Sequence, residues 1–200
     1  QEKFSKKGLM ILYTAPWPGQ GFYTKFPVNS VSDFKGKKLR IYSTATQQMG
    51  SMLGFNATIL PFAEIPQAFS TGLIEALFTS PQTGIDIQAW DNTKHFTYAG
   101  AIFSKNAVVV TKKAFNALSK GDQSNMLAAA KRAELRGWEM SAETTKKQIG
   151  TLKENGMSSK NAPDEVISKM KSIGLEMMKN WRSKASPEAN TVLDRYLSMR

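Results

Sequence analysis

Short apolar segments alternate with polar and turn-forming ones over the first 110 residues. Residues 8–15 form an apolar run that ends at the turn-rich sequence PWPGQG, and residues 37–43 alternate in polarity, so both segments predict strands. Further segments predict strands at 56–62, 74–80 and within 98–115, and short helices at 44–53 and 63–73. This alternation of strands and helices is typical of an α/β fold.

The second half of the chain shows helical periodicity. Apolar side chains recur at helical spacing from Asp122 to about residue 155, and after a polar break further helices open at Pro163 and near residue 186. The apolar stripes are expected to pack in the core, as is a valine run before them. They comprise Met126, Leu127, Ala130, Ala133 and Trp138, then Val166, Ile167, Met170, Ile173, Met177 and Trp181, and the run Val108, Val109 and Val110.

The composition is that of a globular protein, because 41% of the 200 residues are hydrophobic and 22% are charged. No run of about 18 apolar residues occurs, so no membrane-spanning segment is predicted. The chain has no cysteine and one histidine, His95, which excludes disulfides, thiolate metal sites and motifs with two metal-binding histidines. Since no G-x-S-x-G motif accompanies His95, an exposed or strand-edge histidine is expected. No metal and no cofactor are predicted.

The net charge of +11 raises the question of nucleic-acid binding. Residues 101–200 carry 18 basic and 10 acidic side chains, against nine and six in residues 1–100. The basic residues lie in helical stretches that also contain acids, and no aromatic-basic RNA-binding pattern or Cys/His finger occurs. A solvated surface that also attracts small anions is therefore favoured over nucleic-acid binding.

Arg40 is a charged residue inside an apolar strand pattern. It is flanked by Leu39 and Ile41, so its side chain points to the opposite face of the predicted strand. An exposed strand arginine or a structural salt bridge explains such a position. A guanidinium fork for a carboxylate ligand explains it equally, and Ser43 and Thr44 then add hydroxyl groups near the start of the next helix.

The sequences VNSVSDFKGKKLRIYS (28–43) and GFNATILPFAEIPQAFSTGLIEALFTSP (54–81), followed by VVVTKKAFNALSKGDQSNMLAAA (108–130), resemble the TRAP-transporter solute-binding proteins of the DctP type. The resemblance extends over nearly all 200 residues. Its single motifs are loose, but their ordered set is fairly specific. The matching positions are Asp33, Gly36, Lys38, Arg40, Gly54, Glu64, Ala68, Gly72 and Glu75.

The resemblance implies site residues. Arg40 takes the position of the carboxylate-binding arginine, Phe62 that of an aromatic lining the cleft, and Ser43 lies beside the ligand loop. Thr79 replaces the asparagine of many sugar-acid binders. Aromatic walls from Trp17 and Phe78 and a hydroxyl from Ser80 complete a mixture typical of small-molecule sites, although plain core packing also explains Phe62 and Phe78.

The resemblance also implies a periplasmic-binding-protein-like, two-lobed α/β architecture with a long connecting helix. Members of the family have roughly 300 residues, so this chain is expected to lack the N-terminal third and to have an incomplete first lobe. Residues 1–19 are then a remnant of the first lobe and the crossover, residues 20–110 the second lobe, and residues 111–200 the connecting helix and the C-terminal helices packing on the first lobe. The lobes are expected to close around the ligand by a hinge.

Two departures from the family pattern bear on the ligand. Gln20 stands where some members place a second arginine, and Thr79 stands in place of asparagine. Both remove strong polar contacts, so we expect an acid less hydroxylated than a sialic acid. A small hydroxy- or keto-acid, or an aromatic or branched carboxylate, fits better.

The expected function is thus that of a periplasmic receptor that delivers a small organic acid to TRAP permease subunits, without catalysis. The alternative is a small α/β enzyme acting on a carboxylate substrate. Its candidate carboxylates, Glu64, Glu75 and Asp86, are not paired at any recognisable spacing, and helix caps, salt bridges or solvated faces explain each of them.

Overall fold

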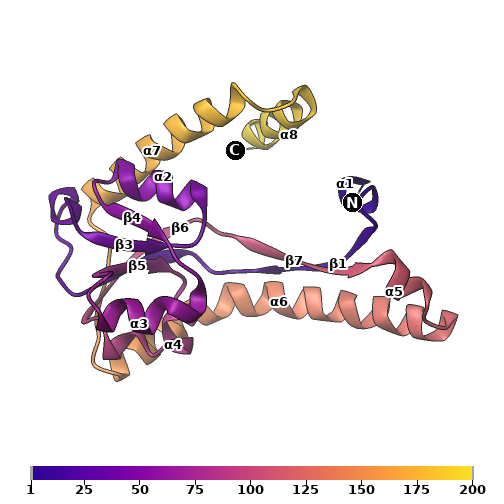
Figure 1. Cartoon of the computed structure of the whole chain (residues 1–200), viewed down its shortest axis with the longest axis horizontal. Coiled ribbons are helices and arrows are strands. Elements are labelled where there is room, and N and C mark those ends of the chain that lie inside the picture. Colours follow the sequence, from indigo (N-terminus) through magenta and orange to yellow (C-terminus); the bar gives the residue numbers. More distant parts are fainter. Residues whose placement is uncertain (1, 200) are drawn as a thin grey trace. The chain divides into compact units, whose positions relative to one another are not determined.

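The computed structural model describes residues 2–199, which form an α/β structure (Figure 1). The chain divides into two compact units that interleave along the sequence. Unit 1 contains residues 1–25 and 78–161, and unit 2 contains residues 26–77 and 162–200. These units have other boundaries than the predicted three-part division at residues 19 and 110, and the assignment of lobes stays a prediction.

A two-stranded ribbon and a long helix form one part of unit 1. The elements are α1 (Glu2–Ser5), β1 (Leu9–Pro16), β7 (Lys105–Thr111), α5 (Lys112–Asn116) and α6 (Lys120–Glu154). Strands β1 and β7 are antiparallel, with a register shift between Ile11 and Tyr13, and α6 runs beside β1 (Figure 1). Glu134 of α6 accepts hydrogen bonds from the backbone N of Thr14 at 2.9 Å and from its Oγ1 at 2.7 Å. This carboxylate therefore anchors the helix next to the bulge in β1.

The second part of unit 1 contains three strands of the six-stranded sheet and a short helix. The elements are β2 (Gln20–Thr24), α4 (Pro81–Asp86), η3 (Ala89–Asp91), β6 (His95–Ala101) and β8 (Ser158–Asn161). Strand β6 pairs antiparallel with β2 and parallel with β8. Phe22, Tyr23 and Phe96 have no exposed surface and form the core of this part.

Unit 2 is built on a parallel arrangement of three strands. The elements are η1 (Val31–Phe34), β3 (Lys38–Ile41), α2 (Thr44–Met52), β4 (Asn56–Ile59), η2 (Phe62–Glu64), α3 (Ile65–Ser70), β5 (Ala76–Thr79), α7 (Asp164–Arg182) and α8 (Pro187–Ser198). Strand β3 pairs in parallel with β4 on one side and with β5 on the other. The boundary between the units falls inside β5, after Leu77. Helix α2 contacts β4 and α7, and the stacked rings of Phe34 and Phe55 add to the core.

The α/β class and most elements agree with the sequence prediction. The predicted strands at 8–15 and 37–43 correspond to β1 and β3, and the predicted helix at 44–53 corresponds to α2. Gly54 ends that helix with a φ of +97°, a conformation that glycine adopts without strain. The long helix predicted from Asp122 is α6, which begins two residues earlier.

Several predictions about strands and burial were wrong. The turn-rich segment PWPGQG already contains the start of β2, and the polar break after α6 contains β8. Three large apolar side chains of the predicted stripes are about half exposed, namely Leu127, Trp138 and Trp181, and Val109 of the valine run is 41% exposed. Helical periodicity identified the helices correctly, but it did not show which apolar faces are covered.

His95 is half-buried at the start of β6. It has β2 on one side and β8 on the other, paired with Thr24 and Ser158, so it does not lie at a strand edge. In residues 2–199, no helix is both long enough and apolar enough to cross a membrane.

Candidate functional site

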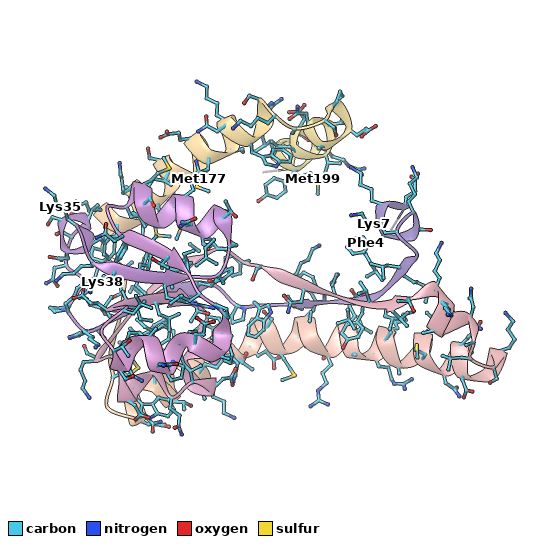
Figure 2. The ribbon with its side chains drawn as sticks, in the orientation of Figure 1. Phe4, Lys7, Lys35, Lys38, Met177 and Met199 are labelled. Atoms are coloured by element: carbon cyan, nitrogen blue, oxygen red, sulfur yellow. The ribbon has the colours of Figure 1, made fainter. Side chains whose placement is uncertain are left out.

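Arg40 is the buried charge of unit 2. It lies on β3 between Leu39 and Ile41, which have no exposed surface, and only 4% of Arg40 itself is exposed. In register it faces Thr58 of β4 and Leu77 of β5. The nearby Lys35 and Lys38, by contrast, are exposed (Figure 2), and the Nζ of Lys38 donates to the backbone O of Gly72 at 3.0 Å. The explanation of Arg40 as an exposed strand arginine is therefore wrong.

The guanidinium of Arg40 is held by a main-chain carbonyl. Its Nε and Nη2 donate to the backbone O of Leu60 at 3.0 and 2.9 Å. Leu60 follows β4 and precedes Pro61, whose ring restricts the chain at this turn. One side of the guanidinium is thus occupied, while both hydrogens of Nη1 and the second hydrogen of Nη2 are directed elsewhere.

The charge of Arg40 has no carboxylate partner within the part of the chain that the structure describes. Ion pairs such as Lys6–Glu2, Lys37–Glu75 and Arg182–Asp194 do not include Arg40, so the structural salt bridge is not found. Burial lowers the pKa of Arg40 from its ordinary value. A guanidinium stays protonated at any physiological pH, so a cation remains at this buried position.

Ser43 begins the helix that follows β3. Its hydroxyl accepts a hydrogen bond from the backbone N of Thr46 at 3.2 Å and lies 2.9 Å from the Thr46 hydroxyl. Ser43 is therefore the N-cap of α2, and this role explains a serine at this position. Its predicted contact with a ligand stays a prediction.

Phe62 is an exposed aromatic residue of unit 2, so core packing does not explain it. It starts η2, two residues after the carbonyl that holds Arg40, and 52% of its surface is exposed. Large apolar side chains so exposed are a feature of interaction sites, although single ones also occur on ordinary surfaces. One turn thus carries both the anchor of Arg40 and an exposed aromatic ring.

Thr79 and Ser80 lie at the junction of β5 and α4 and are 6% and 2% exposed. The Ser80 hydroxyl accepts from the backbone N of Thr83 at 3.2 Å, so Ser80 is the N-cap of α4. As at Ser43, the hydroxyl already has a structural role. Contacts of Thr79 and Ser80 with a ligand stay predictions.

The other predicted aromatic residues belong to unit 1. Phe78 has no exposed surface, and its ring centroid lies 4.8 Å from that of Phe22, so core packing accounts for it. Trp17 is half-buried, and its backbone N donates to the O of Ser104 at 2.8 Å. Gln20, the residue at the second-arginine position, is 3% exposed and donates through Nε2 to the O of Ile102.

Two of the three candidate carboxylates of an enzyme have a polar partner within their own unit. Glu75 lies 3.9 Å from the Lys37 ammonium, and Asp86 accepts a hydrogen bond from Gln82. Within residues 2–199, no group of three acidic or histidine side chains is placed to hold a metal ion. The arrangement therefore gives no support to hydrolytic or metal-dependent chemistry.

The sequence analysis missed two groups that hold the candidate site residues in place. The first is the carbonyl of Leu60, which no side-chain pattern reveals. The second is Tyr23 of β2, whose hydroxyl lies 3.3 Å from the backbone O of both Ser80 and Pro81. The segment GFYT carried a signal for a strand, but the prolines and glycines before it outweighed that signal.

Comparisons with known proteins agree with the expected family. A Bordetella pertussis extracytoplasmic solute receptor that binds pyroglutamic acid is 38% identical, with a TM-score of 0.93, and the match covers 98% of this chain and 65% of that one. A TRAP solute-binding protein specific for pyroglutamate, from a marine metagenome, is 32% identical with a TM-score of 0.91 and the same coverage. These matches confirm the two-lobed periplasmic-binding-protein class of fold. This chain corresponds to only 65% of each of the two solved chains.

A curated relative and a family model extend the comparison. A solute-binding protein of Chromohalobacter salexigens is 25% identical over 156 residues, which are 74% of this chain and 46% of that protein. The chain thus spans about half the length of this relative and 65% of the solved structures. The model of the family described as bacterial extracellular solute-binding protein, family 7 (DctP), matches residues 1–184. The chain therefore belongs to the DctP family of bacterial extracellular solute-binding proteins.

Proposed function

We propose that the chain is the greater part of a periplasmic receptor that binds a small organic acid and delivers it to the membrane subunits of a TRAP transporter. The observation that carries the proposal is Arg40, a buried cation whose only hydrogen-bond acceptor in the described residues is one carbonyl. Family membership supports the receptor role, the periplasmic location and the permease partner. No cofactor and no catalytic residue is part of the proposal.

A buried guanidinium needs an anion. Removing a charge from water is costly, and one carbonyl dipole offsets only part of that cost. The remaining donors on Nη1 and Nη2 form a fork that matches the two oxygens of a carboxylate. Because the Leu60 carbonyl occupies the side formed by Nε and Nη2, we infer that the acid binds end-on, at Nη1 and the outer hydrogen of Nη2.

We further propose pyroglutamate, or an acid of similar size, as the ligand. Two solved relatives with 38% and 32% identity bind pyroglutamate. That molecule has one carboxylate and a lactam ring with few polar groups. It fits the expectation of a small acid that is not polyhydroxylated, which rests on Gln20 and Thr79 in place of arginine and asparagine. The exposed ring of Phe62 is the proposed apolar contact in unit 2.

Isothermal titration calorimetry on the receptor in its natural length tests the proposal. Pyroglutamate is expected to bind with one site per chain. 2-Pyrrolidinone, which has the same ring without the carboxylate, is expected to show no measurable binding, because it offers Arg40 no anion. Galacturonate, a polyhydroxylated acid, is expected to bind much more weakly than pyroglutamate. Equal binding of pyroglutamate and 2-pyrrolidinone, or a preference for galacturonate, overturns the assignment.

A further inference from the structure

Tyr23 is a buried phenol in unit 1 whose hydroxyl reaches the main chain of a neighbouring element. It lies on β2 and has no exposed surface. Its Oη is 3.3 Å from the backbone O of Ser80 and 3.3 Å from that of Pro81, at the first turn of α4. A phenol has one proton to donate, so the two carbonyls share a single donor.

The backbone of α4 lies directly against the ring of Tyr23, and only glycine fits there. A Cβ atom built on Gly84 would lie 2.0 Å from Oη, 2.3 Å from Cζ and 2.6 Å from Cε1 of Tyr23. Such distances are far below van der Waals contact. Gly84 also donates from its backbone N to the O of Ser80 at 3.2 Å, so the same carbonyl is held from within the helix and from β2.

The ring of Tyr23 also packs against an aromatic ring of the neighbouring strand β6. The ring centroids of Phe96 on β6 and Tyr23 lie 4.5 Å apart. The Phe96 ring in turn occupies the space beside Gly21, where a Cβ atom would lie 2.8 Å from it. Two glycines on different elements thus make room for this pair of tilted aromatic rings.

The hydroxyl of Tyr23 is not explained by core packing. A phenylalanine fills the same space and avoids the cost of removing a hydroxyl from water. The hydroxyl therefore contributes through its hydrogen bond to the main chain, at the carbonyls of Ser80 and Pro81. Ser80 is itself fixed by its cap on Thr83, so the strand end and the first helical turn are held together.

We propose that Tyr23 is a positioning residue for ligand binding: its hydroxyl, supported by Gly84, fixes the β5–α4 junction so that Thr79 and Ser80 present their polar groups to the ligand. This inference rests on the proposed function, because Thr79 and Ser80 are proposed ligand contacts. It assigns a role in affinity to a residue that has no exposed surface and acts through the main chain of Ser80 and Pro81.

The first test is Tyr23→Phe, which removes only the hydroxyl. Pyroglutamate affinity is measured by calorimetry, and the unfolding midpoint is measured without ligand. We expect the affinity to fall about threefold to tenfold, which corresponds to one lost hydrogen bond. Tyr13→Phe is the matched control, because it removes a phenol from β1 in the same unit, and it is expected to leave the affinity unchanged. An unchanged affinity in Tyr23→Phe overturns the inference.

A double-mutant cycle separates positioning from a general loss of stability. If Tyr23 acts through Thr79, its substitution has little further effect once Thr79→Val has removed the hydroxyl that Tyr23 positions. We expect Tyr23→Phe to lower affinity in the wild-type background and to change it by less than about twofold in the Thr79→Val background. Additive effects overturn the inference. If the wild type itself binds no carboxylate, the proposed function fails first and this inference fails with it.

Discussion

The β3 strand of unit 2 and the β5–α4 junction of unit 1 differ in whether the chain itself supplies partners for their buried polar groups. At the junction, the hydroxyls of Tyr23 and Ser80 have partners supplied by the chain. On β3, Arg40 is 4% exposed, and the described residues offer its guanidinium one carbonyl and no carboxylate. The first arrangement is complete after folding, and we propose that the carboxylate of the ligand completes the second.

This difference separates structural from functional polar residues. A hydroxyl that caps a helix is explained by the helix, so a ligand contact at Ser43 or Ser80 needs independent proof. A buried cation without a counter-charge is costly to the fold, and such residues are retained at functional sites. The predictions below test whether the two regions differ in this way.

The largest expected effect is that of Arg40→Met on binding. Loss of a buried, hydrogen-bonded charge partner should weaken pyroglutamate binding by roughly 30-fold to several thousand-fold. The free energy of unfolding should change by less than about 2 kcal/mol, because relief of the buried charge offsets the two lost hydrogen bonds to Leu60. Calorimetry and urea unfolding measure the two effects.

Lys38→Met is the matched control for this substitution, since it removes an exposed cation two residues earlier on the same strand. Both its affinity and its stability should stay close to those of the wild type. The account of Arg40 is contradicted if Arg40→Met binds pyroglutamate as tightly as the wild type. It is also contradicted if the substitution lowers the free energy of unfolding by about 3–5 kcal/mol, which is the loss expected when a structural ion pair is broken.

The next prediction compares Phe62 and Phe78, two aromatic residues that the sequence analysis assigned to the same site. Phe78→Ala should lower the free energy of unfolding by about 3–5 kcal/mol, because the ring is fully buried against Phe22. Phe62→Ala should change it by about 0.5 kcal/mol or less, because half of its ring is exposed. Only Phe62→Ala should lower pyroglutamate affinity with the fold intact; if it binds like wild type, Phe62 is a plain surface residue.

Gly84→Ala tests the complete packing of the β5–α4 junction. A Cβ atom 2.0 Å from the Tyr23 hydroxyl forces a shift, so we expect a loss of about 1–3 kcal/mol in the free energy of unfolding. Gly150→Ala in α6 is the control, because a Cβ atom there meets nothing within 4 Å and should add about 0.5–1 kcal/mol. Thermal unfolding measures the stability of both variants. A Gly84→Ala protein as stable as the wild type would show that the β5–α4 junction can shift to accommodate the added Cβ atom.

The smallest effect concerns Glu134, a half-buried carboxylate that accepts two hydrogen bonds from Thr14. The two hydrogen bonds from Thr14 lower the pKa of Glu134 from its ordinary value of 4.5. A lowered pKa in the folded state means that the ionised carboxylate stabilises the fold at neutral pH, and that this contribution is lost as the pH falls below about 4.5. The urea midpoints of wild type and Glu134→Gln should differ slightly near neutral pH and converge in acid. A difference independent of pH contradicts this role.

The sequence predicted the α/β class, most of the elements and the position of Arg40. It did not predict β8, whose residues SSKN include no apolar side chain and whose strand forms because it pairs with β6. Nor did it distinguish covered from uncovered apolar faces, since Trp138 and Trp181 follow the helical period and are still half exposed. Periodicity reports a local pattern, whereas burial depends on which distant segment lies opposite.

The candidate site shows the same limit. The charge of Arg40 in an apolar pattern was visible in the sequence, but its anchor is the carbonyl of Leu60, and every residue has a carbonyl. The hydroxyls of Ser43 and Ser80 were visible as ligand candidates, while their capping bonds appear only where the helices begin. Side-chain chemistry is readable from sequence, and backbone partners depend on the folded chain.

The most direct test of the central claim is a crystal structure of the receptor with pyroglutamate bound. The account predicts that the carboxylate lies end-on against Arg40, with its oxygens about 2.7–2.9 Å from Nη1 and Nη2, while Nε keeps its bond to the Leu60 carbonyl. A ligand whose carboxylate is bound by another cation, with Arg40 still bonded to Leu60 alone, would contradict it.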